Sequence, residues 1–127
     1  MARRTSIYLV ELREACDALQ AYTEGMDLET FSASRMVRSA VERELILIGG
    51  SIERIAQIDP RVGEALAMAR PIMECHHHLL HQPEGPVHEA RLLELARSSD
   101  LLSLRETVSL LLLELGDPAE TTGGSES

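Results

Sequence analysis

Apolar residues recur at steps of three and four along most of the chain, which is the spacing of one face of an α-helix. The first such stripe consists of Tyr8, Leu12, Ala15, Leu19 and Tyr22. Gly25 follows it, and its freedom to adopt a left-handed backbone conformation predicts the end of the helix there. Asp27 is then expected to cap a short helix, and Ser34 to cap the next one.

The longest periodic stretch follows Ser34 and is expected to end at Asp59-Pro60, because proline lacks the N–H that a continuing helix needs. Its stripe consists of Val37, Val41, Leu45, Ile48, Ile52 and Ile55. Gly49 and Gly50 lie inside this helix, where each glycine costs about 1 kcal/mol relative to alanine. That cost indicates a structural reason, such as the close approach of another helix or of a dimer mate.

Two more helical regions flank a loop. The first runs from about Val62 to His81 and is expected to be interrupted near Pro71. Residues 82–86 contain two prolines and a glycine, which predicts a loop. A short helix is expected after it, from about Glu89 to Arg97.

The last helix is expected to start near Asp100, as an N-cap, and to end at Gly116 and Pro118. One stripe consists of Leu101, Leu104, Val108, Leu111 and Leu115, and a second of Leu102, Leu110 and Leu113. A helix that is apolar over more than half its circumference should lie centrally or face a subunit partner.

The sequence shows no strand pattern, so we predict an all-α fold: an up-down bundle of four to six helices that dimerises through helices. We expect one domain over residues 1–116 and a disordered tail over residues 117–127.

Composition narrows the class of protein. The 127 residues carry a formal net charge of −9, and all twelve basic side chains are arginines. With only three aromatic residues, the chain is poorly equipped for stacking bases, so RNA contact would need a local arginine patch. No apolar run is long enough for a membrane span, and we see no signal peptide. Cys16 and Cys75 form no disulfide framework, so we expect a cytoplasmic protein.

Four of the five histidines lie between residues 74 and 81, and His88 follows the loop. Histidine is the side chain suited to proton transfer near neutral pH. One interpretation is a metal site, since Glu74, His78 and His81 fall within about a 60° arc of a helix, and His77 and His81 stand at i, i+4. A second is structural, with histidines that cap a helix end, line a polar interface or meet solvent. A third comes from resemblance.

The order of several segments resembles the HepT-like toxins of the HEPN superfamily, which are small all-helical bacterial proteins. The segments are Ile7-Tyr8-Leu9, Glu14-Ala15-Cys16, Ala21-Tyr22-Thr23-Glu24-Gly25, Arg35, Val41-Glu42-Arg43-Glu44-Leu45, Ile48-Gly49-Gly50, His78-Leu79-Leu80-His81 and residues 89–96. The resemblance covers roughly residues 6–115. It implies a metal-independent, cofactor-free endoribonuclease, a homodimer with RNA as substrate, and an antitoxin of the minimal nucleotidyltransferase type.

The family's active-site motif is R-x4-H-x-Y, usually with Asn after the Arg, and it is degenerate in this chain. Its histidine falls on His81, its arginine on His76, its asparagine on His77 and its tyrosine on Pro83. The resemblance thus implies His81 as general acid/base and His76 at the phosphate position. An unperturbed imidazole has a pKa near 6.5, is mostly neutral at pH 7, and lacks the planar fork of arginine.

Arg70 offers an auxiliary cation, since it precedes His76 by six positions, within the looser R-x4-6-H spacing of the superfamily. Proline at position 83 has no hydroxyl for the antitoxin to modify with AMP. We therefore expect a toxin-type endoribonuclease of a toxin–antitoxin pair whose activity is weakened or lost. The alternative is a non-catalytic dimeric helical binding module on the same scaffold.

Overall fold

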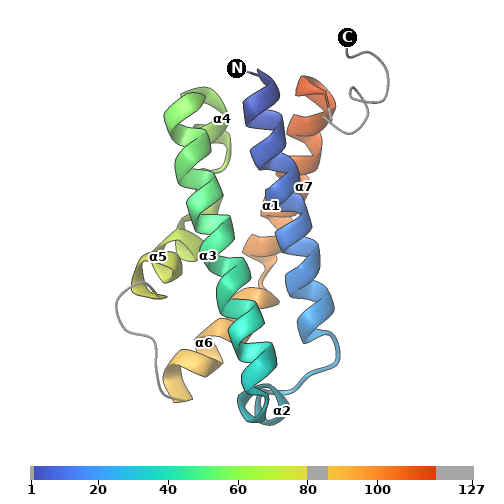
Figure 1. Ribbon diagram of the computed structural model, residues 1–127, viewed down its shortest axis with the longest axis vertical. Coiled ribbons are helices and arrows are strands. Elements are labelled where there is room, and N and C mark those ends of the chain that lie inside the picture. Colours follow the sequence, from blue (N-terminus) through green and yellow to red (C-terminus); the bar gives the residue numbers. More distant parts are fainter. Residues whose placement is uncertain (1, 80–85, 117–127) are drawn as a thin grey trace.

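The computed structural model describes residues 2–79 and 86–116 and is helical throughout, with no strand in these ranges (Figure 1). The helices are α1 (Ala2–Thr23), α2 (Leu28–Ala33), α3 (Arg35–Ile58), α4 (Pro60–Ala65), α5 (Arg70–Leu79), α6 (Pro86–Ala96) and α7 (Ser99–Leu115), with a 3-10 turn, η1 (Ala67–Ala69). The all-α prediction is confirmed. These ranges hold seven α-helices rather than four to six, because the third helical region divides into α4, η1 and α5.

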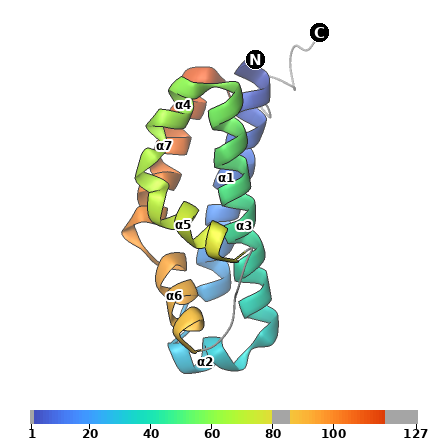
Figure 2. The ribbon, with the colours of Figure 1, turned by 90° about the vertical axis from the view of Figure 1, so that its left-hand side faces the viewer.

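Three long helices form the body of the bundle. Helix α1 packs against α3 on one side and α7 on the other, and the N-terminal end of α1 lies near the C-terminal end of α7 (Figure 1). Helices α5 and α6 lie on the same side of the molecule, both in contact with α3, while α2 closes the far end against α6 (Figure 2). No helix in the described ranges combines the length and the apolar character that a membrane crossing requires.

The predicted starts and stops of the first helices are confirmed. Gly25 has a φ of +74° just after α1, a conformation that favours glycine. Asp27 accepts a hydrogen bond from the Thr30 N–H at 2.8 Å, and this bond lowers the pKa of the Asp27 carboxyl. Ser34 accepts from the Val37 N–H, and Asp59 both ends α3 and caps α4.

Two predicted boundaries were wrong. Helix α7 is capped by Ser98, not Asp100, because Ser98 has an extended backbone and its hydroxyl accepts from the Leu101 N–H. Helix α6 begins at Pro86, and α5 continues through Pro71. Both prolines stand in a first turn, where a missing N–H breaks no bond. The interruption expected near Pro71 is confirmed and lies just before it, at η1, residues 67–69.

The prediction of which residues of the first apolar stripe are buried was also partly wrong. Leu12, Ala15 and Leu19 are buried as predicted, but Tyr22 is 38% exposed and donates a long hydrogen bond to Glu44. Leu9 and Cys16 take part in the core instead. Because the apolar face is wide, the period alone did not fix which edge faces the core.

Cys16 lies in the core, where burial raises the pKa of its thiol to about 12. The thiolate is the reactive form, so Cys16 should resist thiol-specific reagents in the folded protein. In a Cys75→Ser variant, where Cys16 is the remaining thiol, we expect labelling to be at least about 100-fold slower in native buffer than in urea. Equal labelling rates in the two conditions would contradict the burial of Cys16.

The expected close approach of a helix at Gly49-Gly50 is only partly seen. Gly49 is buried, but a Cβ at Gly50 would meet nothing within 4 Å among the described residues. The close approach occurs at Gly63 of α4, where a Cβ would lie 2.8 Å from the Cα of Ala56.

A Gly63→Ala substitution should therefore destabilise the protein. The added methyl group would push α4 away from α3, at a cost of about 1–3 kcal/mol in the free energy of unfolding. Urea unfolding measures this, with Gly50→Ala as the matched control, which should stabilise by up to about 1 kcal/mol because its Cβ meets open space. A Gly63→Ala variant as stable as the unchanged protein would show that α3 and α4 do not touch there.

Helix α7 lies at the side of the bundle, not at its centre. Its buried face consists of Leu101, Leu104, Val108 and Leu112. The second predicted stripe, Leu102, Leu110 and Leu113, is exposed. The sequence allowed this helix either to lie at the centre of the bundle or to face a subunit partner. The exposure of the second stripe excludes the central position.

Candidate functional site

Helix α5 carries the histidine segment and lies across the middle of α3 (Figure 2). Its first turn is fixed by Ile72, which is fully buried in the core. The structure describes the backbone of residues 75–79 but not their side chains, and residues 80–85 lie outside the described ranges. His81, most of the predicted loop and Pro83 therefore fall outside the described residues.

The positions of Arg70 and His76 on α5 are separated both along the helix and around it. Arg70 is the first residue of the helix and its side chain is exposed. Six residues in an α-helix span about 9 Å along the axis and about 120° around it. Arg70 shares a side of the helix more closely with His77, seven positions on. This spacing disfavours the direct pairing of Arg70 and His76 on one phosphate oxygen within one chain.

The first turn of α6, which follows the loop, is held against α3 by polar contacts. His88 Nε2 lies 3.1 Å from Glu42 Oε2, and the His88 side chain is only 7% exposed. Next to this pair, Arg38 Nε lies 3.5 Å from Glu89 Oε2, and Arg38 also donates to the Ser32 carbonyl. His88 thus lies in a polar contact between α6 and α3, a placement of the kind that the second interpretation described.

Both flanks of the segment that carries His81 are held in place, α6 by these polar contacts and α5 by the buried Ile72. Helix α5 precedes the segment and α6 follows it, and both pack on α3. No local pattern indicates that Glu42 and His88 form a pair, because 46 positions separate them along the chain. The metal interpretation involves Glu74, whose side chain is exposed, and three histidines whose side chains lie outside the description: His77, His78 and His81. Among the described side chains no cluster of metal-binding type occurs.

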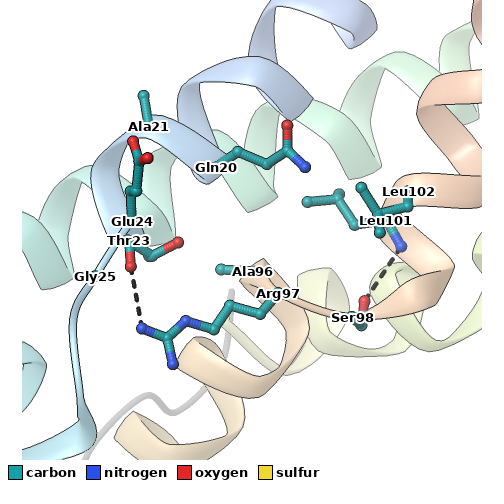
Figure 3. A pocket seen from close by; sticks show the side chains of 10 residues that line it. All are labelled: Gln20, Ala21, Thr23, Glu24, Gly25, Ala96, Arg97, Ser98, Leu101 and Leu102. Atoms are coloured by element: carbon teal, nitrogen blue, oxygen red, sulfur yellow. Dashed lines mark hydrogen bonds between the residues drawn. The ribbon is translucent and has the colours of Figure 1, made fainter.

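An open pocket of about 580 Å³ lies elsewhere, between the end of α1 and the corner that joins α6 to α7 (Figure 3). Arg97 Nη2 donates to the Thr23 carbonyl at 3.0 Å across it, which satisfies one of the last carbonyls of α1. The lining residues are Gln20, Ala21, Thr23, Glu24, Gly25, Ala96, Arg97, Ser98, Leu101 and Leu102. They include no histidine or cysteine and none of the predicted site residues, so the pocket offers no group suited to proton transfer near neutral pH.

An ion pair outside the lining of this pocket joins α7 to α1. Arg105 of α7 pairs with Asp17 of α1, with Arg105 Nη2 3.2 Å from Asp17 Oδ2. The hydrogen bond to Asp17 raises the pKa of the Arg105 guanidinium above its ordinary value. Among the described cations, Arg70 is the one that belongs to the helix of the histidines.

The comparison with protein families gives a match where the histidine segment lies. A model of the family described as ribonuclease HepT-like matches residues 12–82, from the middle of α1 through α5 and past His81. No curated protein and no solved structure matches the chain. The matched region covers more than half of the 127 residues and the whole of α3, on which α5 and α6 pack. The protein therefore belongs to the HepT-like ribonuclease family.

Proposed function

We propose that this protein is a toxin-type endoribonuclease that cleaves RNA without a metal ion and with weakened activity. The observation that carries the proposal is the family match over residues 12–82, which includes both His76 and His81. The all-α bundle supports the proposal, because it is the fold that the family resemblance implies. In this bundle α5 ends at Leu79, two residues before His81. Residues 1–116 are proposed as the functional domain.

Metal-independent cleavage of RNA needs two kinds of group. A general base removes the proton of the 2′-hydroxyl, whose oxygen attacks the adjacent phosphorus, and a general acid protonates the departing 5′-oxygen. A cation stabilises the charge that develops on the phosphate oxygens. We assign proton transfer to His81 and phosphate contact to His76.

The substitution of histidine for the motif arginine explains why the activity should be weak. An arginine is always charged and presents two parallel N–H donors to a phosphate, whereas an ordinary imidazole is mostly neutral at pH 7 and presents one. Arg70 stands about 9 Å from His76 along the axis of α5, at the start of the helix. We propose that it attracts the RNA backbone as an auxiliary cation and does not contact the reacting phosphate.

The partners of the proposed toxin are a second copy of the chain and an antitoxin of the nucleotidyltransferase type. Proline at position 83 has no hydroxyl, so transfer of AMP to this position is chemically excluded. The antitoxin is therefore expected to act by binding instead of by modification at position 83. We place the pair in the cytoplasm.

The test is an incubation of the purified protein with structured RNA in excess EDTA. We expect slow cleavage of RNA, and no cleavage of a matched strand in which every 2′-hydroxyl is replaced by hydrogen. Cleavage of the DNA strand, or cleavage of RNA only after a divalent metal is added, would refute the proposed chemistry.

The non-catalytic binding module is the second candidate function, favoured by one observation. Three of the four motif positions hold other residues: His76, His77 and Pro83. If RNA stays intact in the same incubation while the protein is folded and binds a partner, this second function replaces the first.

A further inference from the structure

A groove between α1 and α3 is a second open hollow on the surface of the bundle. Its volume is about 430 Å³. Helix α1 contributes Glu11, Glu14, Ala15 and Ala18 to its lining, and α3 contributes Glu44 and Leu47. We call these six residues the α1–α3 groove. They combine three carboxylates with an apolar floor and include no arginine or histidine.

The carboxylates of the α1–α3 groove lack a cationic partner among the described residues. Glu11 and Glu14 are exposed, and neither takes part in an ion pair within the described ranges. Glu44 accepts a long hydrogen bond of 3.5 Å from the Tyr22 hydroxyl, and no described arginine forms an ion pair with it. Elsewhere on α1, in contrast, Asp17 is paired with an arginine of α7. The groove therefore gathers three carboxylates that no described cation neutralises.

Exposed apolar side chains continue along the same side of α1 and α3. Steps of four, four, three and four place one row of residues on this side of α1: Ile7, Glu11, Ala15, Ala18 and Tyr22. Ile7 is 41% exposed and Tyr22 38%, and across the groove Leu47 is 43% exposed. The row covers about 22 Å of the helix. Uncovered apolar groups gathered along a groove mark an interaction surface, independently of its charge.

The charge of the α1–α3 groove disfavours three occupants. RNA is a polyanion and would be repelled by the carboxylates. Two copies of the chain related by a two-fold axis through the groove would bring like charges together, which is unfavourable. The tail, residues 117–127, carries three acidic residues and no basic one. Charge complementarity thus favours a cationic occupant.

The shape and the lining of the groove suit a helix. Helices α1 and α3 pack side by side (Figure 1), and a third helix can pack in the groove between two such neighbours. Ala15 and Ala18 are small enough to let its backbone come close, and Leu47 offers an apolar contact. Basic side chains at the edges of that helix would reach the three carboxylates. We infer that the α1–α3 groove binds a basic amphipathic helix of a partner protein.

The groove lies on the side of α3 opposite to α6. Glu42 contacts His88 of α6, whereas Glu44 lines the groove with α1. Residues two positions apart in a helix point about 200° apart around its axis. Since α5 and α6 lie on the same side of the molecule (Figure 2), a helix bound in the groove would leave both uncovered. The inference therefore does not depend on RNA cleavage, and failure of the proposed ribonuclease would leave it standing.

The first test is the binding of a designed peptide to the full chain. The probe is a fluorescein-labelled peptide of about 15 residues, composed of Leu, Ala and Arg with its leucines on one helical face. By fluorescence anisotropy we expect a dissociation constant in the micromolar range that rises with salt. A scrambled peptide of the same composition should bind at least about tenfold more weakly, because its leucines share no face. Equal binding of the two peptides would overturn the inference.

The second test locates the contact by removing carboxylates. A Glu11→Gln and Glu14→Gln double variant should raise the dissociation constant of the peptide at least about fivefold, the effect of losing two exposed ion pairs. The matched control is a Glu106→Gln and Glu114→Gln double variant, which removes the same charge from exposed positions of α7. We expect the control to stay within about twofold of the unchanged protein. Equal weakening in both variants would mean attraction by net charge alone and would refute the groove as the site.

The third test places a cation on the apolar floor. Leu47→Arg should raise the dissociation constant of the peptide at least about tenfold, because the arginine repels the basic peptide and removes an apolar contact. Met36→Arg is the matched control, since Met36 lies on the same helix, is 79% exposed and does not line the groove. An equal effect of the two substitutions would contradict the assignment. A dimer of the chain that Leu47→Arg dissociates would show that a second copy, and not a basic helix, occupies the groove.

Discussion

A His81→Ala substitution should lower the rate of RNA cleavage at least about 100-fold, the usual contribution of a general acid or base. His81 matches the one residue of the family motif that this chain retains, so the proton transfers of the proposed reaction depend on it. Among the described residues the core is built from α1, α3 and α7 with side chains of the flanking helices, so we expect the variant to keep the bundle. Circular dichroism should show unchanged helix content.

The matched control for this variant is His78→Ala. His78 lies three residues earlier in the same segment and corresponds to no motif position. We expect it to cleave at a rate within about threefold of the unchanged protein, since it takes no part in the proton transfers. If both variants lost activity equally, the effect would belong to the segment as a whole, and the assignment of His81 would be wrong.

The second large effect is a gain in the rate of RNA cleavage. A His76→Arg substitution restores the motif cation and should raise the cleavage rate at pH 7 about tenfold or more, because a permanent charge with two donors stabilises the phosphate transition state better. The gain should also depend on pH. The protonated fraction of an ordinary imidazole falls as pH rises through about 6.5, so the ratio of variant to unchanged protein should be larger at pH 8 than at pH 6.

His78→Arg serves as the control for this gain, since it adds the same charge to the same helix at a position outside the motif. It should tighten RNA binding slightly without a comparable rise in the cleavage rate. An equal gain from both substitutions would mean that general attraction of RNA, and not contact with the reacting phosphate, limits the reaction.

Features set by a few neighbouring residues could be predicted from the sequence. Asp27 and Ser34 were identified as caps because a short polar side chain directly before an apolar period has few other roles. The start of α7 was missed because Ser98, Ser99 and Asp100 are all capable caps, and only the backbone conformation selects Ser98. Pro86 was placed in the loop because proline suits both a loop and a first helical turn.

Features set by distant contacts could not be predicted. The apolar pattern of α7 indicated two faces, but whether the chain covers the second depends on where α1 and α6 pack. The contact of His88 with Glu42 joins α6 to α3 over 46 positions, and no local pattern announces it. For the histidine segment, the motif supplied the assignments of His76 and His81. The helix added that the positions of Arg70 and His76 lie about 120° apart around α5.

The chemistry of the RNA ends after cleavage in EDTA tests the proposed ribonuclease most directly. Attack by the 2′-hydroxyl, with His81 moving the protons, leaves a 2′,3′-cyclic phosphate on one fragment and a 5′-hydroxyl on the other. We predict these ends for the unchanged protein and, in greater amount, for His76→Arg. Fragments with a 3′-hydroxyl and a 5′-phosphate, or intact RNA with both proteins, would contradict a metal-independent ribonuclease.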